Sequence, residues 1–533
     1  MRGRPPFFFS PAAGYPADPP HMTAAATETP QANSDRWRRL LASPAAAWLV
    51  IAIGALLRVY RFMQERGVMH SEAVLCYNIL TRDFAGLFRP LESDQASPVG
   101  FLLMQKCSTL LLGGSEHALR LVPLLAGVLA LPLFYRLAKS ILTPRGALLA
   151  IGFLAFAEPL VRYSAEGKQY STDVLWTIVV VWMALRTVKR ADLIRLGIVG
   201  AILIWFCHPI LFVLGGAGLT LAWDHLRRKQ WPLLKIDLAI GAAWLASFAI
   251  NYFAISHAYT GSSYLTDYWD NQNAFAPLIP KTAQQWMWYP RTLRLAFEFP
   301  VGIAPGGNPK AAWILWVAAA GFVAGCLLMI RRQGRMLRVI AGTLLLALAA
   351  SGLHKYPFGE RLILFTAPLL IIPLALAIDA LPSRPLRLIA AALFFIYPIY
   401  MQAKYAIHRP VLYDAKPAMA YVKTHWQTGD GLYLPWESAV LGGYYLHTQP
   451  DFAIPDAHPI RRDDLPAAAD RAQAYTQDIQ PLLGRPRVWI VFSMDPLRER
   501  ALYEQIMTEH GHLLDRYDYP GGAAELYDLR QTR

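Results

Sequence analysis

Charged residues are scarce in this 533-residue chain: they make up 17% of it, whereas average soluble domains carry about 25%. Hydrophobic residues make up 55% and gather in long apolar runs. Together these features argue against one large soluble core. They indicate a polytopic α-helical membrane protein instead.

Cysteine is also scarce, with four residues at Cys76, Cys107, Cys207 and Cys326. Their spacings match no zinc-binding or redox motif. The long C-terminal region contains no cysteine. If the C-terminal region lies outside the membrane, it therefore folds without disulfide bonds.

The apolar runs define eleven candidate membrane spans, since a crossing helix needs about 20 apolar residues. We expect these spans at 44–63, 118–138, 146–161, 171–188, 193–207, 209–224, 236–256, 311–330, 336–353, 362–380 and 386–404. The spans at 146–161 and 193–207 are short. His208-Pro209 fits either a kink or a loop between two spans.

The basic residues set the topology of these spans. The chain has 51 Lys and Arg against 37 Asp and Glu, a formal charge of +14. The basic clusters lie between apolar spans and not on one soluble face, which argues against nucleic-acid binding. With eleven spans they all fall on the side of the N-terminus, which the positive-inside rule makes cytoplasmic. The external side receives 64–117, 162–170, 257–310, 354–361 and the chain beyond about residue 405.

The sequence predicts three parts. Residues 1–43 form a disordered cytoplasmic tail, rich in Pro and Ala. Residues 44–409 form a transmembrane domain with external loops at 64–117 and 257–310, and residues 410–533 form a small external α/β domain. The last part has strand-like runs, helical patterns and a hairpin signal, at 431–434, 487–492, 525–529, 414–426, 496–510 and Gly521-Gly522. It contains no nucleophile–base or metal-ligand pattern.

Acids in the first external loop are candidates for chemistry, because acids near a membrane are costly unless they serve a purpose. The segment 72–88 has apolar residues at helical spacing and predicts an amphipathic helix on the membrane surface. Glu72 is either a general base in a half-dry cleft or part of the solvated face of this helix. Asp94 precedes a proline in a loop, which favours a turn or capping residue.

Cationic side chains occur at the external ends of the spans. Arg58 and Arg120 either extend toward the lipid headgroups or bind an anionic phosphate. One short external link combines both signs of charge with two phenols, at Arg162, Tyr163, Glu166, Lys168, Tyr170 and Asp173. We expect this link to be functional, because charges at the membrane edge are usually paired or used.

A second external link carries His354, Lys355 and Arg361 and predicts a further phosphate pocket, unless Glu360 only neutralises these cations. The loop 257–310 is rich in aromatic residues. They are Tyr264, Tyr268, Trp269, Trp286, Trp288 and Tyr289. They fit an interfacial aromatic belt or a platform on which a sugar or a prenyl chain stacks.

Four motifs, in this order and topology, resemble the membrane glycosyltransferases of the GT-C superfold. The resemblance covers roughly residues 44–405 and is closest to family 39, which includes protein O-mannosyltransferases, the aminoarabinose transferase of lipid A and bacterial relatives. The motifs are His70-Ser71-Glu72-Ala73, Arg120-Leu121-Val122-Pro123, the YSAEGKQY segment at 163–170 and the KYPFGERL segment at 355–362. Ser71 stands where the family has the Asp of an Asp-Glu pair.

This resemblance implies transfer of a sugar from a polyprenyl-phosphate donor to an envelope acceptor, at the external face of a bacterial inner membrane. It implies that Glu72, helped by Asp94, deprotonates the acceptor for inverting attack. The implied ligands of the donor phosphate and sugar are Arg58, Arg120, Tyr163, Glu166, Lys168, Tyr170, His354, Lys355 and Arg361. Cations can neutralise the leaving phosphate in place of a metal, and the use of a divalent metal is left open.

Two other classes of function are weighed against a transferase. A transporter or lipid flippase would carry charged residues deep in its spans and often repeated halves with interrupted helices. In this chain the charges lie mainly at the external edges, and no repeat is evident. A catalytically silent binding or assembly protein is the third reading, and Ser71 is the observation that favours it.

Overall fold

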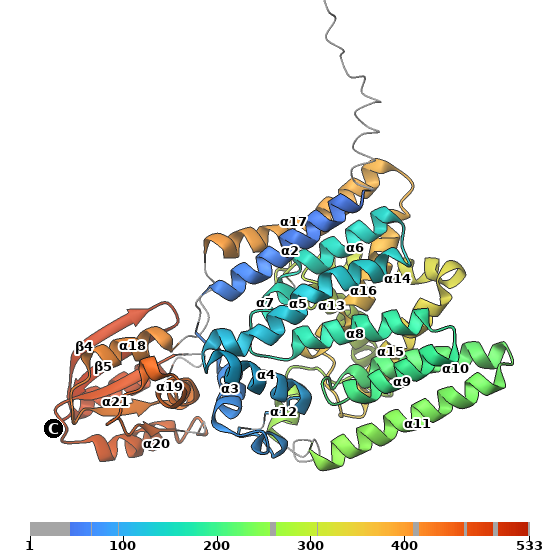
Figure 1. The fold of residues 1–533 in the computed structure, drawn as a ribbon. Helices are drawn as coiled ribbons and strands as arrows, with labels where there is room; N and C mark the ends of the chain where they lie inside the picture. Colours follow the sequence, from blue (N-terminus) through green and yellow to red (C-terminus); the bar gives the residue numbers. More distant parts are fainter. Residues whose placement is uncertain are drawn as a thin grey trace, which may run out of the picture.

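The computed structural model describes residues 43–64, 67–93, 95–255, 263–305, 307–408, 415–462, 466–493 and 499–530. The tail predicted at 1–43 lies outside these residues, apart from Ser43. The Ser43 hydroxyl accepts a hydrogen bond from the Ala46 amide and caps the first described helix. Asp94 also lies outside the described residues. Helices make up most of the molecule, and one small sheet lies at one end of it, at the left of Figure 1.

Each of the eleven predicted spans is helical. The helices are α2 (Pro44–Met63), α5 (Glu116–Lys139), α6 (Pro144–Phe156), α8 (Tyr170–Arg186), α9 (Arg190–Leu203), α10 (Ile210–Arg227), α11 (Trp231–Ala254), α14 (Ala312–Arg332), α15 (Gly334–Gly352), α16 (Ala367–Asp379) and α17 (Arg384–Ile407). Among the described residues, seven stretches are long and apolar enough to cross a membrane, namely α2, α5, α11, α14, α15, α17 and Glu360–Asp379. The multi-pass helical architecture is confirmed. The count of eleven spans stays a prediction, because α6, α8, α9 and α10 are not among these stretches. Helices α6, α8 and α9 have only 13, 17 and 14 residues.

Two predicted spans end earlier than expected. Helix α6 ends at Phe156, and the short helix α7 (Glu158–Tyr163) begins after Ala157 with Pro159 in its first turn. Proline suits the first turn of a helix but cannot continue the preceding one. Helix α9 ends at Leu203, and Pro209 caps α10 as a separate helix. His208-Pro209 therefore belongs to a break between two helices.

Glycines allow the membrane helices to pack closely. Where α10 crosses α15, a Cβ added to Gly342 would lie 2.9 Å from the Cα of Gly216. Where α14 crosses α16, a Cβ added to Gly325 would lie 1.9 Å from the carbonyl oxygen of Pro373. Close approach of this kind stabilises helix pairs in a bilayer, where burial from water supplies no drive for association.

Shorter helical segments connect the spans on the predicted external side. They are α3 (His70–Thr81), η1 (Gly86–Phe88), α4 (Val99–Leu112), α12 (Ser263–Asn271), α13 (Ala283–Glu298) and η3 (Glu360–Thr366). The surface helix predicted at 72–88 is wrong in extent and in environment. Helix α3 ends at Thr81, and Ala73, Cys76 and Ile79 are fully buried. The reason is that α4 and a helix of the C-terminal domain, α19 (Trp436–Thr448), pack against α3.

The C-terminal domain contains a five-stranded mixed sheet with the order β2-β1-β3-β5-β4. Its strands are β1 (Gly431–Leu434), β2 (Ile460–Arg461), β3 (Val488–Phe492), β4 (His512–Tyr519) and β5 (Gly522–Asp528). Strand β1 is parallel to β2 and β3, and β5 is antiparallel to β3 and β4. Its other helices are α18 (Lys416–His425), α20 (Arg471–Ile479), α21 (Arg500–His510), η4 (Pro450–Phe452) and η5 (Gln480–Leu482). The predicted strands and the hairpin at Gly521, whose φ is 107°, are confirmed, and β4 forms the first arm of that hairpin. Strand β2 was not predicted.

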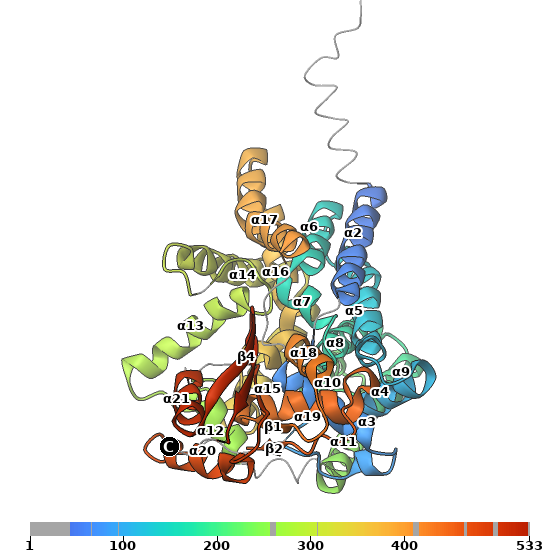
Figure 2. The same ribbon diagram turned by 90° about the vertical axis from the view of Figure 1, so that its left-hand side faces the viewer.

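The sheet domain and the membrane helices share one apolar core. Figures 1 and 2 show α19 beside α3. Buried side chains from both sides pack in a single cluster, among them Leu75 and Phe101 of the membrane side and Met419 and Tyr444 of the sheet side. This contact holds the sheet domain at the end of the bundle where α5 begins.

Candidate functional site

Several helix ends meet beneath the sheet domain. Glu72 lies in the first turn of α3 and Arg120 in the second turn of α5. The turn 164–169 leads into the first turn of α8, and η3 begins with Glu360 and Arg361. Hydrogen bonds and charge interactions link all four elements. Residues from widely separated motifs are thereby brought into one region.

Glu72 and Arg120 form a buried ion pair at the centre of this region, with exposed fractions of 1% and 3%. Arg120 Nε and Nη2 donate to Glu72 Oε1 and Oε2 at 2.8 and 3.1 Å. The Gly167 amide donates to Oε1 at 2.7 Å, and the Met69 amide donates to Oε2 at 3.4 Å. The carboxylate therefore ties α3, α5 and the turn before α8 together.

This geometry does not fit the predicted role of Glu72 as the general base. A carboxylate offers about four lone-pair positions, and four N–H donors point at those of Glu72. A base needs a position open to the acceptor proton. The contacts instead fit a positioning residue that fixes Arg120 and the Gly167 amide.

Gly167 lets the turn approach the ion pair. A Cβ at this position would lie 3.0 Å from Cys76 Sγ and 3.4 Å from Glu72 Oε1. Any larger side chain would push the turn away and lengthen the bond to Glu72. The residue that follows, Lys168, is held close to the same centre as a result.

Lys168 is a buried cation whose charge interacts with that of the partly exposed Arg361. Lys168 is 7% exposed, and its ammonium donates to Gln95 Oε1 at 3.1 Å. Burial and the positive charge of Arg361 lower the pKa of Lys168 to about 8. A buried cation that is repelled by a second positive charge favours a bound anion.

Aromatic rings surround Arg361. Its guanidinium lies 5.0 Å from the ring centre of Trp269 and 6.0 Å from that of Tyr268. Glu360 lies 3.5 Å away, but its carboxylate is half exposed to solvent. Such an exposed pair is weak, so Arg361 keeps much of its charge for a ligand.

The link 162–170 contributes phenols and one more ion pair. The rings of Tyr163 and Tyr170 meet edge to face at 4.9 Å. Arg162 Nε donates to Glu166 Oε1 at 2.9 Å, and Glu166 is 4% exposed. Glu166 is thus paired with Arg162. The hydroxyls of Tyr163 and Tyr170 instead interact electrostatically with Arg361.

Residues 96–253 match a family model described as dolichyl-phosphate-mannose-protein mannosyltransferase. The matched stretch contains Arg120 and the whole link 162–170. No curated protein matches the sequence significantly.

Solved structures are similar over most of the chain. ArnT from Cupriavidus metallidurans bound to undecaprenyl phosphate has a TM-score of 0.53 at 12% identity, covering 91% of this chain and 98% of its own. The chain has the GT-C fold. The oligosaccharyltransferase AglB from Archaeoglobus fulgidus, in complex with an inhibitory peptide and a dolichol-phosphate, has a TM-score of 0.46 at 13% identity, covering 90% of this chain and 74% of its own. The fold that the four sequence motifs implied is confirmed.

Within this GT-C fold, Arg58 does not take the predicted place at the donor phosphate. Its guanidinium donates to the carbonyl oxygens of Gly54, Leu154 and Ala155 at 2.9, 2.9 and 3.2 Å. The last two carbonyls belong to the final turn of α6, whose carbonyls have no partner within the helix. Arg58 is therefore a structural link between α2 and α6.

His354 and Lys355 are also placed differently from the prediction. The His354 ring stacks on Phe275 at 4.5 Å, lies 3.9 Å from Asp270 and is 54% exposed. Lys355 is exposed. Among the described residues, no recorded contact joins either side chain to Lys168 or Arg361. Of His354, Lys355 and Arg361, only Arg361, which lies in η3, interacts electrostatically with Lys168.

A metal centre is not supported by the described part of the chain. No three His, Cys, Asp or Glu side chains there form a group that could hold a metal ion. We therefore assign no residue to a metal.

Sequence reasoning missed Gln95, Glu116 and their partners. Glu116 accepts hydrogen bonds from Lys416 at 3.2 Å and from the Tyr445 hydroxyl at 2.9 Å, and it lies 3.8 Å from Arg120. The four-residue spacing of Glu116 and Arg120 was a usable signal. Lys416 and Tyr445 gave none, because they are distant in sequence. Through Glu116 the sheet domain contacts the ion pair of the site.

Proposed function

We propose that this GT-C protein transfers a sugar from a polyprenyl-phosphate donor to an envelope acceptor at the external face of a bacterial inner membrane. The observation that carries the proposal is the pair of neighbouring cations, Lys168 and Arg361, beside the buried Glu72–Arg120 pair. The region lies where several membrane helices end. A phosphate at headgroup depth, carried by a lipid, would reach this place.

The two cations provide what a departing polyprenyl phosphate requires. As the bond between the anomeric carbon and the phosphate oxygen breaks, negative charge develops on the phosphate. Preorganised cations in a water-poor site stabilise such charge strongly. ArnT, whose fold this chain shares, was solved with undecaprenyl phosphate, which supports a donor of this kind.

The general base is assigned to Asp94, because the lone pairs of Glu72 are engaged. Asp94 directly precedes Gln95, the residue whose side chain accepts a hydrogen bond from Lys168. Asp94 is thus adjacent in the sequence to a residue that contacts Lys168. It would take the proton of the acceptor hydroxyl as that oxygen attacks the anomeric carbon, which gives inversion.

Lipid analysis of a deletion strain tests the function. A polyprenyl-phosphate sugar should accumulate when the gene is removed, because its consumer is missing. Complementation with the intact gene should clear it. An unchanged lipid profile together with a lost transport phenotype would contradict the transferase and favour a flippase.

Replacing Asp94 by Asn should lower kcat by about 10²–10⁴-fold, the usual contribution of a general base. The measurement is sugar transfer by purified protein with the donor that the deletion strain identifies. Glu92→Gln is the matched control, since Glu92 is 61% exposed and only loosely paired with Arg82 at 3.6 Å. An Asp94→Asn variant with the activity of the control would refute the assignment.

Donor binding should weaken at alkaline pH. Because the pKa of Lys168 is lowered to about 8, its ammonium is charged below that pH and neutral above it. KM for the donor should therefore rise by up to about tenfold for each pH unit above 8. Lys168→Arg should remove this dependence, since a guanidinium stays protonated throughout the range. The same pH profile in both proteins would contradict the role of Lys168.

A further inference from the structure

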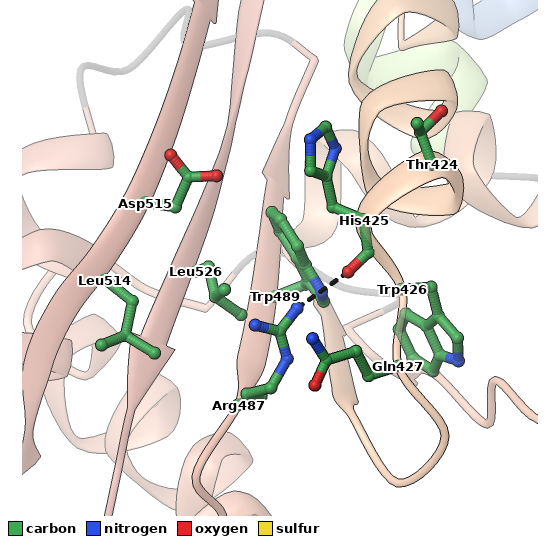
Figure 3. A pocket seen from close by; sticks show the side chains of 9 residues that line it. All are labelled: Thr424, His425, Trp426, Gln427, Arg487, Trp489, Leu514, Asp515 and Leu526. Atoms are coloured by element: carbon green, nitrogen blue, oxygen red, sulfur yellow. Dashed lines mark hydrogen bonds between the residues drawn. The ribbon is translucent and has the colours of Figure 1, made fainter.

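The sheet domain contains an open cleft of about 600 Å³ that the proposed chemistry does not use. It lies between the end of α18 and the turn after it, on one side, and strands β3, β4 and β5 on the other. Figure 3 shows the nine side chains that line it. Its volume falls in the range of about 300–1,000 Å³ typical of small-ligand sites.

Apolar surfaces form the floor and two walls of this cleft. Trp489 and Leu526 are buried and form its floor. Trp426 is half-buried on the α18 side, and Leu514 is 46% exposed on the opposite side. A ligand in the cleft would contact flat or aliphatic surface on both sides.

A β-bulge sets the position of Leu514. Leu513 pairs with Tyr527, and Asp515 pairs with Leu526, so Leu514 is the extra residue of β4. Bulges are frequent next to functional sites, where they redirect a side chain. The bulge also turns Asp515 into the cleft wall, where its Oδ2 accepts a hydrogen bond from Tyr421 at 2.8 Å.

Arg487 is held rigidly within the cleft. Its Nε donates to Asp430 Oδ1 and its Nη2 donates to the His425 carbonyl, both at 2.8 Å. Its guanidinium lies 5.9 Å from the ring centre of Trp489. A guanidinium has five N–H groups, and among the described residues these bonds use two. The others are available to a ligand at little entropic cost.

His425 and Gln427 complete the polar lining. His425 Nδ1 lies 2.9 Å from the Tyr421 carbonyl, so this nitrogen carries the hydrogen and the neutral ring offers Nε2 as an acceptor. Gln427 is exposed and offers both a donor and an acceptor. Donors and acceptors thus alternate around apolar surface.

This combination matches a neutral saccharide. A sugar ring has aliphatic C–H faces that pack on aromatic surfaces and a rim of hydroxyls that both donate and accept hydrogen bonds. A phosphate or another anion would favour several cations, whereas Arg487 faces Asp430 and Asp515 lines the same cleft. The lining therefore favours hydroxyls over charge.

We propose that this cleft binds a neutral hexose or N-acetylhexosamine unit of the acceptor glycan. The proposal rests on the proposed function only in assigning that sugar to the acceptor. Helix α18 runs from Lys416, which contacts Glu116 near the ion pair, to His425 at the cleft. Its ten residues span about 15 Å. An acceptor of several sugars would reach from the cleft to the site beneath the domain.

Saturation-transfer NMR on the full chain tests this binding. The protein is placed in lipid nanodiscs free of sugar-based detergent, and the probes are maltose, cellobiose and N,N′-diacetylchitobiose. We expect at least one disaccharide to bind the intact protein. We expect Trp426→Ala and His425→Ala each to weaken that binding by about tenfold, since each removes a ring from the wall.

Trp286→Ala is the matched control, because Trp286 is 62% exposed on α13, outside the cleft. It should leave disaccharide binding unchanged. Circular dichroism checks that Trp426→Ala is folded, and the exposed His425 provides a second variant if it is not. Absence of binding by all three disaccharides, or equal binding by all variants, would overturn the proposal. Binding without any transferase activity would leave it standing and refute the proposed function instead.

Discussion

A Glu72→Gln variant should be destabilised by roughly 3–5 kcal/mol and should lose nearly all transferase activity. The substitution leaves Arg120 buried at 3% exposure with its nearest remaining acid, Glu116, 3.8 Å away. A buried charge that loses its hydrogen-bonded partner carries a cost of this size. Denaturant titration of the purified protein measures the stability, and the transfer assay measures the activity.

A double replacement separates stability from positioning. Changing Glu72 to Leu and Arg120 to Met removes both charges, which is often neutral for stability when the new residues pack well. We expect stability to recover while activity stays lost, because the Gly167 amide then has no carboxylate to hold it. Full activity in the stable double variant would show that the ion pair does not position the site. Glu92→Gln serves again as the exposed control.

Lys168→Met and Arg361→Met should each lower kcat/KM by about 10²–10³-fold. This is the usual loss when one preorganised donor to developing charge is removed. Without one cation the phosphate of the bound donor is held less tightly, so KM should rise. The same phosphate is less stabilised as it leaves, so kcat should fall. The double variant should show no activity above background in the transfer assay.

Lys355→Met provides the matched control for these cations. Lys355 has the same side chain as Lys168 and lies in the same motif as Arg361, but it is exposed. We expect its activity to stay within about twofold of the intact protein, because exposed charges contribute little. Equal losses in Lys355→Met and Lys168→Met would mean that general surface charge, and not a defined phosphate site, attracts the donor.

The membrane architecture could be predicted because it follows from local sequence. Long apolar runs determine where membrane helices form. The strands at 431–434 and 487–492 and the hairpin at Gly521 likewise carry local signals. The α6–α7 break at Ala157 was missed, although Pro159 marked it. Hydrophobicity outweighed that proline in the span assignment.

Sequence motifs could identify only those site residues that belong to the motifs themselves. Glu72, Arg120 and Lys168 each belong to one of the sequence motifs, and the structure brings these three residues into one region. The role of Glu72 could not be predicted, since it depends on the Gly167 amide reaching across from another helix. Arg58 gave the signal of a phosphate ligand, but the open carbonyls of α6 take its guanidinium. Contacts of this kind exist only in three dimensions.

The burial of α3 shows the same limit. Its sequence indicates a surface helix, but α4 and α19 both pack against it. Helix α19, hundreds of residues later, covers it instead and joins Tyr445 to Glu116. No local pattern in 68–100 announces that partner.

The most direct test is an electron cryomicroscopy structure of the protein in nanodiscs with undecaprenyl phosphate. We expect phosphate density within about 3 Å of both Lys168 Nζ and the Arg361 guanidinium, the distance of a charge-assisted hydrogen bond. The prenyl chain should leave this place toward the bilayer. Phosphate bound only at exposed cations such as Lys355, with Lys168 still donating to Gln95, would contradict this expectation.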